Sequence, residues 1–339
     1  MAWAEVCING ATNQLTAVRG LRCPSPNWLP FRGIGANLFD VLWDAERQRS
    51  YVSRADTIHA METFAAAGLR YFRCFGKLFG HYQNRWLSNP TQFWAGFDFV
   101  VNEAAERGLY IILSLELGSF DALVDDEGFN AIIQDRSSRA RTLAQLYVQE
   151  VIVRYNNRST ILFWELTNEL NLPTAIPPPR EVCDPHKRDR CFGTESLATF
   201  TADMVLEIRR IDKVRPISSG FAAPRPSAWN LEHRGSWRRD SREQWMNMLK
   251  WQNREVDIMS IHLYGGRECY FDGGCTRNEH VVEAAAEAAA SEGKQLFLGE
   301  YGPISDYKYM SAVLQLQVDA ARAPAESPLR AFMLSTVVE

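Results

Sequence analysis

Eight short apolar runs alternate with longer helix-period segments along almost the whole chain, and this alternation limits the folds that it can adopt. The runs cover residues 31–37, 70–75, 109–115, 160–166, 216–219, 256–262, 295–299 and 329–334. Segments with one apolar face lie between them, at residues 54–67, 93–107, 139–155, 197–211 and 281–290. Strands that alternate with helices form parallel sheets, and eight such strands close into a (β/α)8 barrel.

An open, doubly wound sheet is the structural alternative. FRGIGANLF has Gly33 and Gly35 but no third glycine at the spacing of a dinucleotide-binding loop. Gly68 and Gly108 follow helix-period segments and precede strands, as left-handed helix caps would. The barrel is therefore the fold class that we predict.

The chain of 339 residues is long enough for one barrel with insertions. It shows no internal repeat and no linker that would separate two domains. We therefore expect an N-terminal extension, residues 1–30, packed on a barrel formed by residues 31–339. Few residues follow the last apolar run, so we expect the barrel to be incomplete at its C-terminal strand or helix.

Charge and hydropathy exclude two broad classes of protein. The 37 Lys and Arg residues against 41 Asp and Glu give a net charge of −4, which would not attract a phosphate backbone. We therefore expect no nucleic-acid partner. No apolar stretch approaches the roughly 18 to 20 residues that a membrane span requires, so we expect no such span.

Six of the seven cysteines form three short-range couples: Cys7 with Cys23, Cys183 with Cys191, and Cys269 with Cys275. Such couples indicate disulfides and an oxidising, extracellular compartment, although MAWAEVCING shows no signal peptide. Free thiols in a cytosolic protein are one alternative. Zinc at Cys183, His186 and Cys191 is another, but it lacks a second close ligand pair. Cys74, inside the apolar YFRCFG, is expected to be a core residue.

Two long insertions follow predicted strands, at residues 172–191 and 221–240, and would lie at the binding rim of a barrel. The second insertion contains Trp229 and Trp237 among arginines. Aromatic planes beside polar donors suit stacking on sugars. A solvated basic loop explains the same composition equally well.

Two glutamates stand directly beyond predicted strands. Glu169 follows the fourth strand in ILFWELTNEL, and Glu300 follows the seventh in QLFLGEYG. In a barrel both would project from one rim. Burial raises a carboxyl pKa and facing carboxyls repel, so one is expected to be protonated and the other ionised. Glycoside hydrolysis needs one carboxyl as an acid and one carboxylate as a nucleophile. If either glutamate stood alone, the simpler interpretation would be a strand-end carboxylate paired with a lysine or a helix terminus.

Four motifs resemble glycoside hydrolase family 5 of clan A. WELTNE, residues 164–169, looks like the clan's fourth-strand motif, in which an Asn-Glu pair closes the strand. DIMSIHLY, residues 257–264, resembles the family's sixth-strand His-x-Tyr, and LGEYG, residues 298–302, resembles its nucleophile strand. Arg73 in RYFRCFG matches its second-strand arginine. The similarity extends from Phe31 to the last strand.

The resemblance implies a retaining double displacement. Glu169 would be the general acid/base and Glu300 the nucleophile, with the carboxyls about 5–5.5 Å apart. Asn168 would hydrogen-bond the sugar 2-hydroxyl, or else only form a turn. Arg73 would hold Glu300 ionised, or else make only a rim ion pair.

The resemblance also implies that Tyr264 donates a hydrogen bond to Glu300 and that His262 lines the site, although a histidine after a strand is commonly structural. Cellulase-like members place a histidine after the third strand, where this chain has Glu116 in LSLELGSF. Glu116 would bind a sugar hydroxyl or pair with a nearby arginine. The eighth-strand run AFMLSTVVE lacks the family's usual tryptophan, so Trp43, after the first strand, would supply an aromatic platform.

The function implied by this resemblance is retaining, endo-acting hydrolysis of a β-glycan. FWAGFDFVVNEAAERGLYIILSL followed by WELTNEL is closer to the mannanase-like members, which favours mannan over cellulose. The alternative is a catalytically weak or inactive barrel that binds carbohydrate. We expect a monomer with a polysaccharide or oligosaccharide partner, no organic cofactor and no metal.

Overall fold

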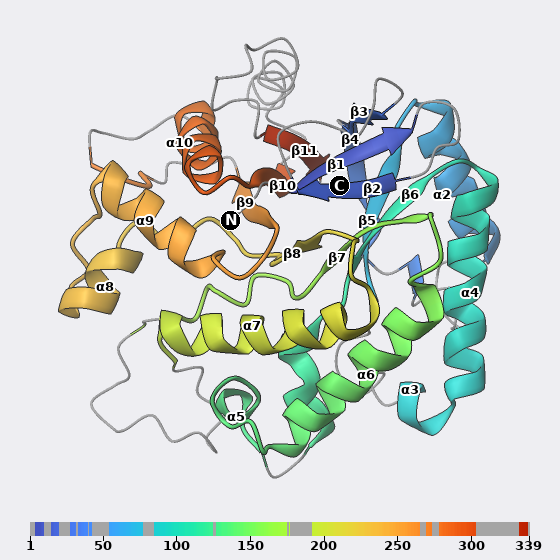
Figure 1. Cartoon of the computed structure of the whole chain (residues 1–339), viewed down its shortest axis with the longest axis horizontal. Helices are drawn as coiled ribbons and strands as arrows, with labels where there is room; N and C mark the ends of the chain where they lie inside the picture. The colour runs from blue at the N-terminus through green and yellow to red at the C-terminus, as the bar shows by residue number, and fades with distance from the viewer. Residues whose placement is uncertain are drawn as a thin grey trace.

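The computed structural model forms a closed barrel of eight parallel strands in the order β10-β11-β4-β5-β6-β7-β8-β9 (Figure 1). It describes residues 4–9, 15–19, 28–31, 33–39, 41–42, 54–76, 85–124, 127–174, 176, 192–264, 269–272, 278–302 and 332–337. The barrel strands are β4 (Gly33–Asn37), β5 (Tyr71–Phe75), β6 (Tyr110–Ser114), β7 (Ile161–Glu165), β8 (Ile217–Ser218), β9 (Ile258–Tyr264), β10 (Gln295–Gly302) and β11 (Phe332–Val337). The predicted fold class is confirmed.

Closure of the barrel depends on β11, which pairs in parallel with β10 on one side and with β4 on the other. The expectation of an incomplete eighth strand is therefore wrong. The strand also begins at Phe332, three residues later than the apolar run at 329–334 indicates.

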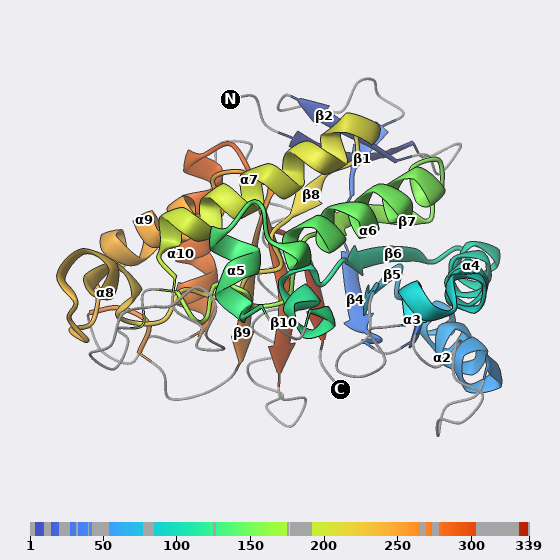
Figure 2. The same cartoon turned by 90° about the horizontal axis from the view of Figure 1, so that it is seen from below.

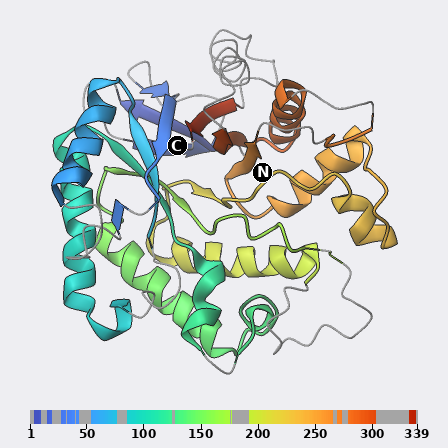
Figure 3. The same ribbon diagram turned by 180° about the vertical axis from the view of Figure 1, so that it is seen from behind.

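Five helices lie where the sequence predicts them, on the outside of the strands (Figures 1 and 3). They are α2 (Arg54–Ala66), α4 (Pro90–Glu106), α6 (Arg139–Tyr155), α7 (Thr194–Ile211) and α10 (Asn278–Ser291). Gly68 and Gly108 follow α2 and α4 with φ of +78° and +67°, so both predicted left-handed caps are confirmed.

The described residues also contain helical segments that were not predicted: α3 (Arg85–Ser88), the 3-10 segment η2 (Leu117–Leu123), α5 (Phe129–Gln134), α8 (Ala228–Arg234) and α9 (Arg242–Gln252). Most are too short to show a helical period. The longest, α9, begins with a capping box in which Ser241 and Gln244 bond each other's backbone. That S-x-x-Q signal was available in the sequence.

A separate antiparallel sheet precedes the barrel, in the order β2-β1-β3. Its strands are β1 (Ala4–Asn9), β2 (Leu15–Arg19) and β3 (Trp28–Pro30). In Figure 2 the hairpin β1–β2 lies at the top, and the arrows of β4, β9 and β10 point away from it. The division of the chain at residue 30 and the packing of the extension on the barrel stay predictions.

Aromatic and aliphatic side chains plug the barrel where its strands begin. One buried cluster contains Phe31, Tyr71, Tyr110, Ile112, Leu162, Phe163, Ile258 and Phe297. The rings of Phe163 and Phe297 meet edge to face at 5.3 Å. Because side chains alternate along a strand, the next inward residues after Tyr71 and Phe163 are Arg73 and Glu165. A polar layer therefore lies directly above the apolar plug.

The strand β10 carries an irregularity that decides where Glu300 points. Leu298 is paired with Ile261 of β9, but Glu300 is paired with the next residue, His262, so Gly299 is an extra residue in the ladder. A β-carbon on Gly299 would lie 2.7 Å from Nε2 of His262. Only glycine permits this approach of β10 to the histidine ring.

Of the two predicted insertions, only the second is fully described. The first leaves the barrel near Thr174 and returns at Phe192, and these two residues form an isolated parallel bridge. The second is described throughout and contains α8. There Trp229 stacks on His233 with the ring centroids 4.1 Å apart, and the Arg234 guanidinium lies 5.1 Å from the Trp229 ring. Trp237 is 63% exposed.

The helices that the structure describes include none with the length and apolarity to span a membrane. Cys74 is buried and free, as predicted. Cys269 is buried and disulfide-bonded. The predicted partner Cys275 lies outside the described residues, as do Cys23, Cys183, Cys191 and His186.

Lys294, just before β10, is buried beneath the end of α9. Its ammonium group donates hydrogen bonds to the carbonyl oxygens of Asn253, at 2.6 Å, and Arg254, at 2.8 Å. Burial lowers the pKa of Lys294 from 10.5 to about 8, although Asp257, Glu292 and Glu255 act in the opposite direction. The folded protein therefore releases this proton at a lower pH than the unfolded chain does.

This difference predicts a pH-dependent contribution to stability. Between about pH 8 and pH 10.5 the unfolded chain still holds the proton that the folded protein has lost, so the free energy of unfolding rises with pH. Urea unfolding should give the free energy of unfolding of the wild type and of Lys294→Met. The value for the wild type minus the value for the variant should rise by up to about 3 kcal/mol across this window. Lys250→Met on α9 is the control. A difference that stays flat or shrinks would refute the assignment.

Candidate active site

Six polar side chains from distant parts of the sequence meet at the carboxyl ends of the barrel strands. Parallel strands of a barrel all end at one rim, which is why residues so far apart in the chain share one site. β5, the turn after β7, β9 and β10 supply them: Arg73, Asn168, Glu169, His262, Tyr264 and Glu300.

Arg73 lies at the centre of the group and is fully buried. Its Nε donates to Oε1 of Glu165 at 2.8 Å, and its NH2 group lies 2.6 Å from the same oxygen. NH1 donates to Oε1 of Glu300 at 2.8 Å and to Oδ1 of Asn37 at 3.2 Å. NH2 also donates to Oδ1 of Asn168 at 2.8 Å. Every nitrogen of the guanidinium is therefore held in place.

The charge of Arg73 is stabilised despite its burial. Burial acts to lower the pKa of Arg73, but the carboxylates of Glu165 and Glu300 outweigh it, and the pKa is raised. A buried cation needs this compensation, because an unpaired charge in the interior carries a large desolvation cost.

Glu300 is only 5% exposed and accepts hydrogen bonds on both oxygens, from Arg73 on Oε1 and from the Tyr264 hydroxyl on Oε2. Burial acts to raise the pKa of Glu300, but the charges of His262 and Arg73 and the two hydrogen bonds lower it. Burial thus acts on the pKa of Glu300 in the expected direction, but these partners outweigh it, and Glu300 is held as an anion.

Glu169 faces Glu300 across His262. Nδ1 of His262 lies 3.1 Å from Oε1 of Glu169 and 3.4 Å from Oε1 of Glu300. One carboxylate oxygen of each glutamate and a ring nitrogen of His262 lie within 4.8 Å of one another. The Glu169 side chain is 28% exposed, against 6% for Glu300. The two carboxyls are therefore neighbours in different surroundings.

The residues Glu169 and Glu116 both have left-handed backbone conformations, with φ of +53° and +54°. Such conformations are strained for side chains other than glycine and asparagine, and they concentrate at functional sites. Glu116 directly follows β6 and is 4% exposed, and its Oε1 accepts a 2.9 Å hydrogen bond from the Ser114 hydroxyl. Its charge also acts on Arg73.

Tyr264 is 42% exposed and forms the solvent-facing side of the site. Burial of its hydroxyl and the hydrogen bond to Glu300 raise its pKa, so the phenol keeps its proton and remains a donor.

The trio of Glu169, His262 and Glu300 has donor atoms of the kind that bind divalent cations. However, both Glu300 oxygens already accept hydrogen bonds, and the Arg73 guanidinium 2.8 Å away repels a cation. The donor set therefore suits a metal ion poorly. The arrangement suits two carboxylates that act on an uncharged molecule.

Two participants were missed at the sequence level. Glu165 and Asn37 end β7 and β4 and bond Arg73 from two sides. Strand alternation was the available signal for Glu165, since it stands two residues beyond the inward Phe163. Trp43, the predicted platform, lies outside the described residues.

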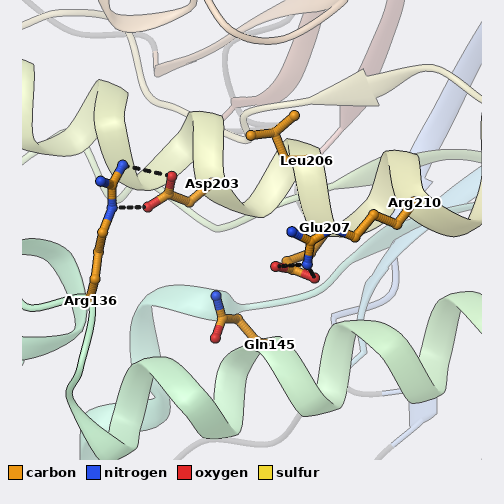
Figure 4. Close-up of a pocket in the computed structure, with 6 residues that line it drawn as sticks. All are labelled: Arg136, Gln145, Asp203, Leu206, Glu207 and Arg210. Carbon is orange, nitrogen blue, oxygen red and sulfur yellow. Dashed lines mark hydrogen bonds and ion pairs between the residues drawn. The ribbon is translucent and has the colours of Figure 1, made fainter.

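A second hollow is lined by other residues and lies between α6 and α7 (Figure 4). Arg136 and Asp203 form a two-pronged ion pair across its mouth, and Arg210 pairs with Glu207. Leu206 is 59% exposed beside them. Its charged groups are matched to one another, which is typical of a solvated helix groove.

Comparison with known proteins agrees with this geometry. The family model for cellulase (glycosyl hydrolase family 5) matches residues 34–322. Mannan endo-1,4-beta-mannosidase F of Aspergillus fumigatus is 23% identical over 290 residues, covering 83% of this chain and 59% of that protein. Mannan endo-1,4-beta-mannosidase A of Podospora anserina is 25% identical over 219 residues, covering 62% of this chain and 51% of that protein.

Solved structures show the same fold. An endo-beta-1,4-mannanase from Thermotoga petrophila superposes with a TM-score of 0.63 at 16% identity, covering 91% of this chain and 67% of that one. The endo-1,4-beta-mannanase from Rhizomucor miehei gives a TM-score of 0.62 at 13% identity, covering 99% and 90%. The chain spans about half to three fifths of the length of the curated relatives named above. The family match over most of the chain, on the barrel that carries these motifs, makes this protein a member of glycoside hydrolase family 5.

Proposed function

We propose that this barrel hydrolyses β-mannan by a retaining double displacement. The observation that carries the proposal is the proximity of Glu169 and Glu300, whose nearest oxygens lie within 4.8 Å at one rim. Retaining glycosidases hold their two carboxyls about 5–5.5 Å apart, because one must reach the anomeric carbon while the other reaches the glycosidic oxygen. Inverting enzymes need roughly 6.5–9.5 Å to admit a water molecule between them.

Glu300 is the nucleophile of this mechanism. Its lowered pKa keeps it ionised, and Arg73 and Tyr264 orient its two oxygens. It attacks the anomeric carbon, the bond to the leaving oxygen breaks, and a covalent glycosyl ester forms. Water then attacks the same carbon and releases Glu300.

Glu169 is the general acid and base. It is more exposed than Glu300, so it can exchange protons with solvent between the two steps. It first gives its proton to the leaving oxygen and then takes one from the attacking water. His262 holds Oε1 of Glu169 at 3.1 Å and thereby fixes the position of the transferred proton.

Further side chains are proposed to bind the sugar. The carbonyl oxygen of the Asn168 side chain is bound by Arg73, which leaves its amide NH2 to donate to the 2-hydroxyl. Glu116 and Trp43 remain proposed contacts for a hydroxyl group and for a sugar face. Mannan is the proposed polymer because the two fungal relatives are named for it.

We also propose that the enzyme is a secreted monomer with disulfides. The buried, disulfide-bonded Cys269 supports an oxidising compartment. Proteins that digest polymers too large to enter a cell act outside it, which agrees with this location.

The first prediction concerns the nucleophile. The wild type should hydrolyse mannan in preference to glucan and xylan, with product released in the β-configuration as seen by NMR. Glu300→Ala should lower turnover by roughly 10⁴-fold or more while mannan binding persists, because the covalent step is lost. Glu195→Gln, an exposed carboxylate on α7, is the control. Equal and negligible hydrolysis by the wild type and by Glu300→Ala would favour a barrel that only binds carbohydrate.

The second prediction concerns the acid. Glu169→Gln should slow cleavage of mannan far more than cleavage of an activated aryl mannoside, because a good leaving group needs little protonation. The ratio of the two losses should be about 10²-fold or greater. Added azide should restore turnover of the aryl substrate, since an anion needs no base to attack. Equal slowing of both substrates would remove Glu169 from the acid role.

A further inference from the structure

Glu165 is a buried carboxylate that the proposed mechanism does not use. It is 0% exposed, and its Oε1 receives both the Nε hydrogen bond and the NH2 contact of Arg73. Its second oxygen, Oε2, has no hydrogen-bond partner among the described residues. Burial of a carboxylate is costly unless its charge is compensated, and here Arg73 supplies the compensation.

The turn after β8 packs closely against the Glu165 side chain. Gly220 adopts a left-handed conformation with φ of +72° against the Glu165 side chain. A β-carbon there would lie 2.7 Å from Cγ of Glu165 and 1.7 Å from the carbonyl oxygen of Thr167. Only glycine fits between the Thr167 carbonyl and the Glu165 side chain, so the turn after β8 packs directly against this carboxylate.

We propose that Glu165 is a positioning residue that acts on the nucleophile Glu300 through Arg73. It binds the rear edge of the guanidinium, which turns NH1 toward Glu300 and NH2 toward Asn168. It also shares the positive charge of Arg73 between two carboxylates. Glu300 therefore lies beside an Arg73 cation whose charge Glu165 already partly neutralises. The inference rests on the proposed function, which makes Glu300 the nucleophile.

The purpose of this arrangement follows from the chemistry of the covalent step. A carboxylate bound to an uncompensated arginine is a poor base and a correspondingly weak nucleophile. A carboxylate with no cation beside it would remain protonated in a buried site. Glu165 produces an intermediate situation, because it holds Arg73 in place and weakens the electrostatic attraction between Arg73 and Glu300.

The electrostatic consequence has a definite sign. In Glu165→Gln the amide oxygen still accepts from Arg73 Nε, but the negative charge is gone. Arg73 then stabilises the Glu300 anion more strongly, and the repulsion between the two carboxylates also disappears. Both changes lower the pKa of Glu300. The other charged or titratable groups around Glu300 are unaltered: Arg73, Glu169, His262 and Tyr264, together with Glu116, whose charge acts on Arg73.

Two readouts test the proposal. The first is the acidic limb of the pH profile of kcat/KM on an aryl β-mannoside, which reports the ionisation of the free enzyme's nucleophile. The second is the ¹³C NMR titration of the Glu300 carboxyl in protein labelled at the glutamate side-chain carboxyl, assigned by its loss in Glu300→Gln. In Glu165→Gln both midpoints should fall by roughly 0.5 to 1 pH unit relative to the wild type.

The chain offers a matched control in Asp212→Asn. Asp212 is a buried carboxylate, 5% exposed, that pairs with Arg215 and accepts from the indole of Trp164, the neighbour of Glu165 on β7. This variant loses the same charge from a similar pair that has no contact with Glu300. It should leave both midpoints where they are in the wild type.

Glu165→Asp tests the position of the carboxylate at residue 165 separately from its charge. It also provides a second test if Glu165→Gln fails to fold. It keeps the negative charge but withdraws the acceptor from Arg73 by one methylene. The midpoints should move by less than about 0.3 pH unit, while kcat falls roughly ten- to a hundredfold because Arg73 and Glu300 lose their alignment.

Midpoints that stay fixed or rise in Glu165→Gln, or an unchanged kcat in Glu165→Asp, would overturn the inference. Failure of the proposed function looks different, since the wild type would then cleave no mannoside. The carboxyl titration of Glu300 needs no turnover, so it decides the role of Glu165 in that case too.

Discussion

A single buried cation, the guanidinium of Arg73, organises the rim of this barrel. Burying a guanidinium is expensive unless each donor finds an acceptor and the charge finds a counter-charge. Here the acceptors come from three other strands or the turns after them: Asn37, Glu165, Asn168 and Glu300. Because the fork of an arginine is planar and rigid, these contacts fix the relative positions of the strands that carry them.

The apolar plug beneath this layer gives the electrostatics their strength. The Phe163–Phe297 pair and its neighbours close the barrel below Arg73 and keep solvent out from that side. Charges interact more strongly where water is excluded. Tyr264 and Glu169 lie at the exposed edge instead, where substrate and protons can enter. The site is therefore shielded from water at its base and open to solvent at its outer edge.

The sequence predicts the architecture of this protein well and the details of its site less well. Strands and helices follow from periodicity, since short apolar runs and longer amphipathic segments have distinct spacings. Parallel strand order then brings Glu169 and Glu300 to one rim without further information. The lowered pKa of Glu300 could not be predicted in this way, because it depends on whether Arg73 and His262 reach the carboxylate in three dimensions.

Two further features were beyond the reach of pattern reasoning. The extra residue at Gly299 changes which side of β10 faces the barrel, and a strict alternation would have pointed Glu300 outward. The left-handed backbone of Glu169 and Glu116 is likewise a local exception that propensities disfavour. Such exceptions arise where the surrounding fold holds a residue against its own preference, which is common at reactive sites.

The bridge between Thr174 and Phe192 has a consequence for how such a barrel diversifies. It holds these two residues beside each other, and Thr174 stands a few residues after Glu169 in the sequence. Lengthening a loop with fixed ends costs little, since the entropy of closure grows only with the logarithm of its length. A change in the number of residues between Thr174 and Phe192 should therefore cost little stability as long as the bridge keeps its two ends together.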